Sequence, residues 1–76
     1  MGNQDSALVE EPKVLPEVAT PRQAAEFVHS TTQALAQDRY LNRGLPYVKY
    51  GGRIRYLRRD VLEYLAHNRV NPSGAS

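Results

Sequence analysis

Residues 45–56 decide the fold, and they read Leu-Pro-Tyr-Val-Lys-Tyr-Gly-Gly-Arg-Ile-Arg-Tyr. Two short runs rich in β-branched and aromatic residues, at 47–50 and 53–57, flank a Gly-Gly pair that supplies the positive φ angles of a two-residue hairpin turn. Basic and apolar residues alternate along both runs, so we expect one face to pack and the other to carry positive charge. The stretch therefore predicts a cationic β-hairpin whose basic residues are Lys49, Arg53 and Arg55.

Two short helices are predicted before this hairpin. Residues 20–23 (Thr-Pro-Arg-Gln) combine an N-cap threonine, a proline at the first helical position and a glutamine three residues after the cap, which together form a capping box. The helix that they open is expected to end near Val28. A second capping box at residues 30–33 (Ser-Thr-Thr-Gln) predicts a helix from there to about Tyr40.

The second helix is expected to turn Ala34, Leu35 and Tyr40 toward the core and its threonine and glutamine side chains outward. Residues 42–44 (Asn-Arg-Gly) predict its end, with Gly44 as the C-terminal glycine. A turn between two short helices is the arrangement of a helix-turn-helix.

A third helix is predicted after the hairpin, from Arg58 or Arg59 to about Asn68. The expected order of elements is therefore helix, helix, hairpin, helix. The tyrosines are expected to pack with their hydroxyls at the surface. The predicted apolar stripe of the third helix is Val61, Leu62, Tyr64 and Leu65, and the tyrosines expected in the core are Tyr47, Tyr50, Tyr56 and Tyr64.

Charge and composition restrict the class of protein. The 76 residues allow one small domain, and the absence of cysteine excludes disulfides and Cys-ligated metals. We expect an acidic arm over residues 1–17, a basic domain over 18–69 and a tail over 70–76, and a basic domain favours a polyanionic partner. Neither a membrane span nor a signal peptide is predicted, which favours the cytoplasm.

A family resemblance rests on several of these segments. Residues 20–27, 35–40 and 44–56, followed by Arg-Arg-Asp-Val at 58–61, resemble the excisionase-type, MerR-like winged helix-turn-helix DNA-binding domains. The resemblance covers about residues 18–68. It is closest to the versions carried by actinobacterial phages and integrated elements.

The resemblance implies a mainly α domain with a small β-hairpin, in which the second helix enters the major groove and the hairpin reaches the adjacent minor groove. It implies an excisionase, or recombination directionality factor: a sequence-specific protein that binds and bends double-stranded DNA and directs integrase-mediated excision. The implied partners are double-stranded DNA, a site-specific integrase and further copies bound cooperatively at repeated sites, in the nucleoid of a bacterial host cell. The chain departs from many members at His29, Ser30 and Asp38.

The candidate DNA contacts fall into three groups. Glutamine can bond bidentately to adenine and threonine can contact a thymine methyl group or a phosphate, so the second helix supplies a major-groove group. Basic residues beside it suit phosphates, and an arginine after a bare glycine turn suits a narrow minor groove. The major-groove group is Thr31, Thr32, Gln33 and Gln37; the phosphate group is Arg39, Arg43, Lys49 and Arg55; the minor-groove group is Gly52 and Arg53.

Each group also has a plainer interpretation. The helix residues can be solvated side chains, with Gln33 used in its capping box. Arg39 can pair with Asp38 or Glu26, and the charge on the hairpin can serve to discourage aggregation at a strand edge.

Two other functions remain open from the sequence. A small phage or plasmid transcriptional regulator would use the same module, and a protein-interaction adaptor would use its surface for a protein partner. An enzyme is not predicted, because Asp60 and Glu63 have no nucleophile near them in the pattern. His29 and His67 are isolated from acidic pairs at metal spacing, so no metal and no cofactor are expected.

Overall fold

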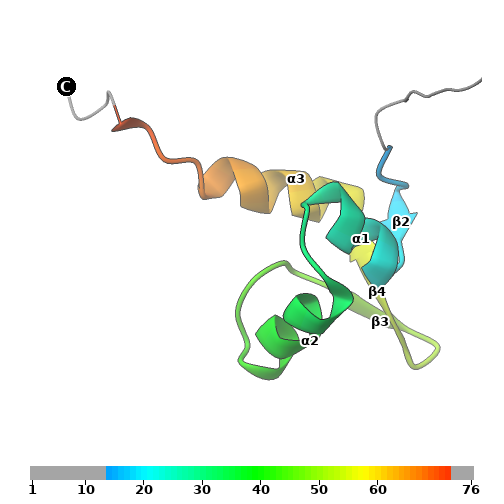
Figure 1. Cartoon of the computed structure of the whole chain (residues 1–76). Coiled ribbons are helices and arrows are strands. Elements are labelled where there is room, and N and C mark those ends of the chain that lie inside the picture. Colours follow the sequence, from blue (N-terminus) through cyan, green and yellow to red (C-terminus); the bar gives the residue numbers. More distant parts are fainter. Residues whose placement is uncertain (1–13, 73–76) are drawn as a thin grey trace, which may run out of the picture.

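The computed structural model describes residues 14–72. It contains three helices and a three-stranded antiparallel sheet with the strand order β2-β4-β3 (Figure 1). The predicted order of helix, helix, hairpin and helix is confirmed, and the structure adds the short strand β2. The elements are β2 (Val18–Ala19), α1 (Pro21–Phe27), α2 (Thr32–Tyr40), β3 (Val48–Tyr50), β4 (Arg53–Leu57) and α3 (Arg58–His67).

Strand β2 ties the chain before α1 to the hairpin. Ala19 pairs with Tyr56 of β4, and Leu15, ahead of the strand, is only 2% exposed in the core. The Nη1 atom of Arg58 donates to the Leu15 carbonyl at 3.2 Å, and the Arg58 backbone N–H donates to the Glu17 carbonyl at 2.9 Å. Among the described residues, Leu15 already packs in the core, ahead of the boundary predicted at residue 18. Most of the predicted arm and tail, residues 1–13 and 73–76, lies outside the described residues.

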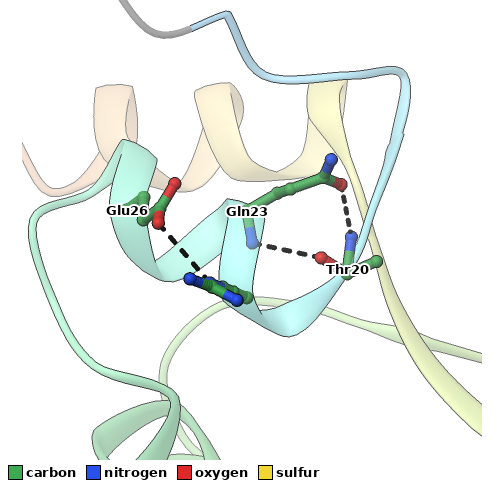
Figure 2. Close-up of polar contacts among 4 residues, drawn as sticks. Thr20, Gln23 and Glu26 are labelled. Carbon is green, nitrogen blue, oxygen red and sulfur yellow. Dashed lines mark hydrogen bonds and ion pairs between the residues drawn. The ribbon is translucent and has the colours of Figure 1, made fainter.

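Helix α1 begins with the predicted capping box. The Thr20 hydroxyl accepts from the Gln23 backbone N–H at 3.1 Å, and the Gln23 side-chain oxygen accepts from the Thr20 N–H at 3.0 Å (Figure 2). The helix ends where His29 adopts a positive φ of 60°. The Ser30 N–H then reaches back to the Ala25 carbonyl at 2.7 Å, which satisfies a carbonyl at the end of the helix.

The start of α2 differs from the prediction. Its N-cap is Thr31, whose hydroxyl accepts from the Ala34 N–H at 3.0 Å. The capping box predicted from Ser30 and Gln33 is therefore wrong, and the N-cap lies one residue later, at Thr31. Because the cap lies at Thr31, the third helical position is Ala34, whose methyl group cannot accept a hydrogen bond from the Thr31 N–H.

The end of α2 differs as well. Asn42, with a φ of 57°, takes the left-handed position predicted for Gly44, and the Arg43 N–H donates to the Asp38 carbonyl at 2.9 Å. Asparagine tolerates this conformation better than most residues. Gly44 has a φ of 86°, and a Cβ atom there would lie 2.7 Å from an Asp38 carboxylate oxygen. The glycine is thus needed for the loop after the helix.

The core draws on residues from all parts of the described chain. Phe27, Val28, Ile54 and Tyr64 pack against it from partly buried positions. The buried residues are Leu15, Ala19, Ala24, Ala25, Leu35, Leu45, Tyr56 and Val61.

Some residues predicted to lie inward are exposed. Ala34 and Tyr40 of α2 are exposed, and Tyr40 is 85% exposed because it lies about 140° around the helix from the buried Leu35. On α3, Leu62 is 46% exposed because it lies about 100° around the helix from the buried Val61, and Leu65 is 41% exposed. None of the helices within residues 14–72 combines the length and the apolar character that a membrane span requires.

Candidate nucleic-acid interface

The tip of the β3–β4 hairpin is a bare two-residue turn, as predicted. Gly51 and Gly52 have φ angles of 58° and 81°, and a Cβ atom on either would meet nothing within 4 Å. Positive φ at both central positions is the geometry of a type I′ turn, whose twist suits a hairpin. In the view of Figure 1 this tip and α2 both lie below α1 and α3.

The pairing register distributes the cations over both faces of the hairpin. Lys49 pairs with Ile54, so it shares a face with Ile54 and with Tyr56. Arg53 and Arg55 lie on the opposite face. The predicted single cationic face is therefore wrong, because a two-residue turn pairs odd-numbered residues with even-numbered ones. A count of alternate residues that continues through the turn ignores this pairing, and it places all three cations on one face.

The cations nearest the tip are available to a ligand. Lys49 and Arg53 are exposed, and neither side chain has an ion-pair or hydrogen-bond partner among residues 14–72. Arg55 is half-buried, and its Nη1 atom donates to the Ile54 carbonyl at 2.6 Å. Of the predicted hairpin contacts, Arg53 and Lys49 thus keep all their donors free within the described chain.

The exposed face of α2 is polar and uncharged. Thr32, Gln33 and Gln37 point outward as predicted, and neither glutamine has a side-chain partner within residues 14–72. Tyr40 extends the same face, because it lies three residues after Gln37. The Thr31 hydroxyl accepts the capping bond from the backbone, so its oxygen already has one partner.

Arg39 lies against the hairpin instead of facing solvent. Its Nη1 atom donates to the Tyr56 hydroxyl at 2.6 Å. Its guanidinium carbon lies 5.8 Å from the centroid of the Tyr47 ring and 6.0 Å from that of the Tyr56 ring. Of the two acidic partners considered from the sequence, Asp38 binds Arg43 instead. A cation–π and hydrogen-bonded contact holds the Arg39 side chain.

Arg43 is held by an acidic residue. Its Nε atom donates to the Asp38 carboxylate at 3.0 Å, and this ion pair is partly exposed. Asp38 thus engages a cation that was predicted to contact phosphate. Of the predicted phosphate group, Arg39, Arg43 and Arg55 each have a hydrogen-bond partner within residues 14–72, and Lys49 is the member that has none.

Sequence reasoning missed Tyr50 as a surface residue. It was expected in the core, but it is 79% exposed and pairs with Arg53 across the turn. The signal was present, because a residue that flanks a tight turn lies at a tip that nothing can cover. Of the other tyrosines expected in the core, Tyr56 is buried at 1% exposure and Tyr64 packs against the core from a partly buried position.

Within residues 14–72 no group of three or more histidine, aspartate or glutamate side chains is placed to hold a metal ion. No protein-family model, curated protein or solved structure matches this chain.

Proposed function

We propose that this chain is a winged helix-turn-helix protein that binds double-stranded DNA, with α2 in the major groove and the β3–β4 hairpin in the adjacent minor groove. The observation that carries the proposal is a pair of cations, Arg53 and Lys49, beside a bare glycine turn and without a side-chain partner in the described part of the chain. An arginine on such a turn can enter a narrow minor groove, where the negative potential is strongest. Gln33 and Gln37 on α2, whose side chains have no partner within residues 14–72, supply groups that can read adenine.

The two elements would contribute differently to binding. The exposed face of α2 carries no charge, so it would contribute specificity more than affinity. The hairpin would supply most of the phosphate contacts. With Arg39 and Arg43 engaged in contacts within the protein, the hairpin cations Lys49, Arg53 and Arg55 remain to neutralise DNA charge. Three such contacts correspond to a slope of log affinity against log salt of about −3.

We infer further that the protein acts as an excisionase. In this role it would bend DNA, bind cooperatively at repeated sites and direct a site-specific integrase toward excision. The support is the resemblance of residues 18–68 to that family, together with a hairpin and helix order that is compatible with a winged helix. A transcriptional regulator would use the same surfaces but would need one or two sites near a promoter.

A mobility-shift titration tests the proposal. The DNA is the region flanking the protein's own gene, at low and moderate salt, and the variant is Arg53→Ala. Arg59→Ala is the matched control, because it removes the same charge from an exposed position of α3. A ladder of complexes that weakens with salt and with Arg53→Ala supports an excisionase. A single complex favours the regulator, and the absence of any complex at low salt refutes DNA binding.

A further inference from the structure

Arg39 connects the two elements that the proposed function places in neighbouring grooves. Within residues 14–72, its bond to the Tyr56 hydroxyl is the one hydrogen bond or ion pair that joins α2 to the β3–β4 hairpin. The main packing partner of α2 is α1, not the sheet. Arg39 is thus the side chain whose hydrogen bond connects α2 directly to the hairpin.

The groups that hold Arg39 are themselves held firmly. Tyr56 is 1% exposed and lies in the central strand, opposite Ala19 of β2. Tyr47 immediately precedes β3, and its ring centroid lies 6.4 Å from that of Tyr56. The guanidinium is thus in contact with aromatic rings from both arms of the hairpin base. Such a contact restricts the direction of the planar guanidinium as well as its distance.

We propose that Arg39 is a positioning residue that sets the angle between α2 and the hairpin, and through this angle the bend of the bound DNA. This inference rests on the proposed function. A duplex held in two adjacent grooves must follow the relative orientation of the two elements that hold it. Because bending DNA costs free energy, a loosened connection lets the duplex straighten.

A positioning role and a phosphate contact make different predictions for Arg39. A phosphate contact contributes to counterion release, so its loss reduces the salt slope by about 1. A positioning residue leaves the number of phosphate contacts, and so the slope, unchanged. Loss of a positioning residue changes the bend of the bound DNA instead.

The decisive variant is Tyr56→Phe, which removes the acceptor of the Arg39 bond and alters no charge. Tyr64→Phe is the matched control, because this half-buried tyrosine of α3 has no hydrogen-bond partner for its hydroxyl within the described chain. The bend is measured by energy transfer between dyes at the two ends of a short duplex, at saturating protein. Saturation matters because a variant that is only less stable still gives the full bend once it is bound.

We expect Tyr56→Phe to reduce the bend, to leave the salt slope unchanged and to weaken affinity about three- to tenfold, the size expected of one hydrogen bond. Arg39→Lys, which keeps the charge but loses the planar group, should show the same loss of bend. A full bend in both variants overturns the positioning role. A salt slope that falls by about 1 in Arg39→Ala also overturns it, in favour of a phosphate contact. If the unchanged protein neither binds nor bends the duplex, the proposed function itself fails.

Discussion

The tip of the β3–β4 hairpin and the loop after α2 both combine a glycine at positive φ with a neighbouring arginine, in opposite surroundings. At the tip, a Cβ atom on Gly52 would meet nothing within 4 Å, and Arg53 has no partner among residues 14–72. After α2, a Cβ atom on Gly44 would collide with Asp38, and the same Asp38 binds Arg43 at 3.0 Å. The number of arginines near a candidate interface therefore overstates the number that are ready to bind an anion.

The largest expected effect separates the two glycines. Gly44→Ala should lower the free energy of unfolding by about 2–3 kcal/mol, because it adds a collision with Asp38 to the cost of a positive φ. Gly52→Ala should cost about 1 kcal/mol, since only the backbone conformation is unfavourable there. Urea unfolding of both variants measures the difference. Equal losses of stability in the two variants would mean that the Asp38 side chain moves away from the added methyl group. The loop after α2 would then have as much space as the hairpin tip.

The second test compares the two arginines on DNA. Arg53→Ala should weaken affinity about tenfold, or ~1.4 kcal/mol, because it removes a free cation from the tip. Arg43→Ala should change affinity less than about twofold, since its Nε atom is already bound to Asp38. Titrations at one fixed salt concentration check this. Equal losses would show that Arg43 leaves Asp38 when DNA binds.

A third test concerns the N-terminus of α2, where Thr31 caps the helix. Thr31→Ala should lower the free energy of unfolding by about 1 kcal/mol, because it removes the hydroxyl that caps the Ala34 N–H. Ser30→Ala is the control, and it should change the stability by less than about 0.5 kcal/mol. Thermal unfolding of the pair is the measurement. A larger loss from Ser30→Ala would restore the cap position predicted from the sequence.

The smallest expected effect is a gain. Asp38→Asn removes the charge that holds Arg43 and should raise DNA affinity about two- to threefold, within the range of an exposed ion pair. Glu63→Gln makes the same change of charge on α3 and controls for net charge. Affinities are compared at low salt, where the gain should be largest. An equal gain from Glu63→Gln would assign the effect to net charge alone.

Local chemistry made much of the fold predictable. The Thr20 capping box, the Gly-Gly turn and the start of α3 at Arg58 each depend on residues close together in the chain. Strand β2 could not be predicted, because two residues carry no periodicity and their pairing with β4 exists only once the sheet has formed. The burial of Leu15 has the same origin.

The candidate interface likewise has some features that follow from local sequence and others that depend on tertiary contacts. The sequence by itself determined a hairpin with Arg53 beside a bare turn and a helix with outward glutamines, because turn geometry and helical spacing are local properties. Only the tertiary structure decided that Asp38 and Tyr56 engage the arginines on the α2 side. Side-chain partners depend on segments that meet in space, and Arg39 and Tyr56 are brought together across 17 residues of chain.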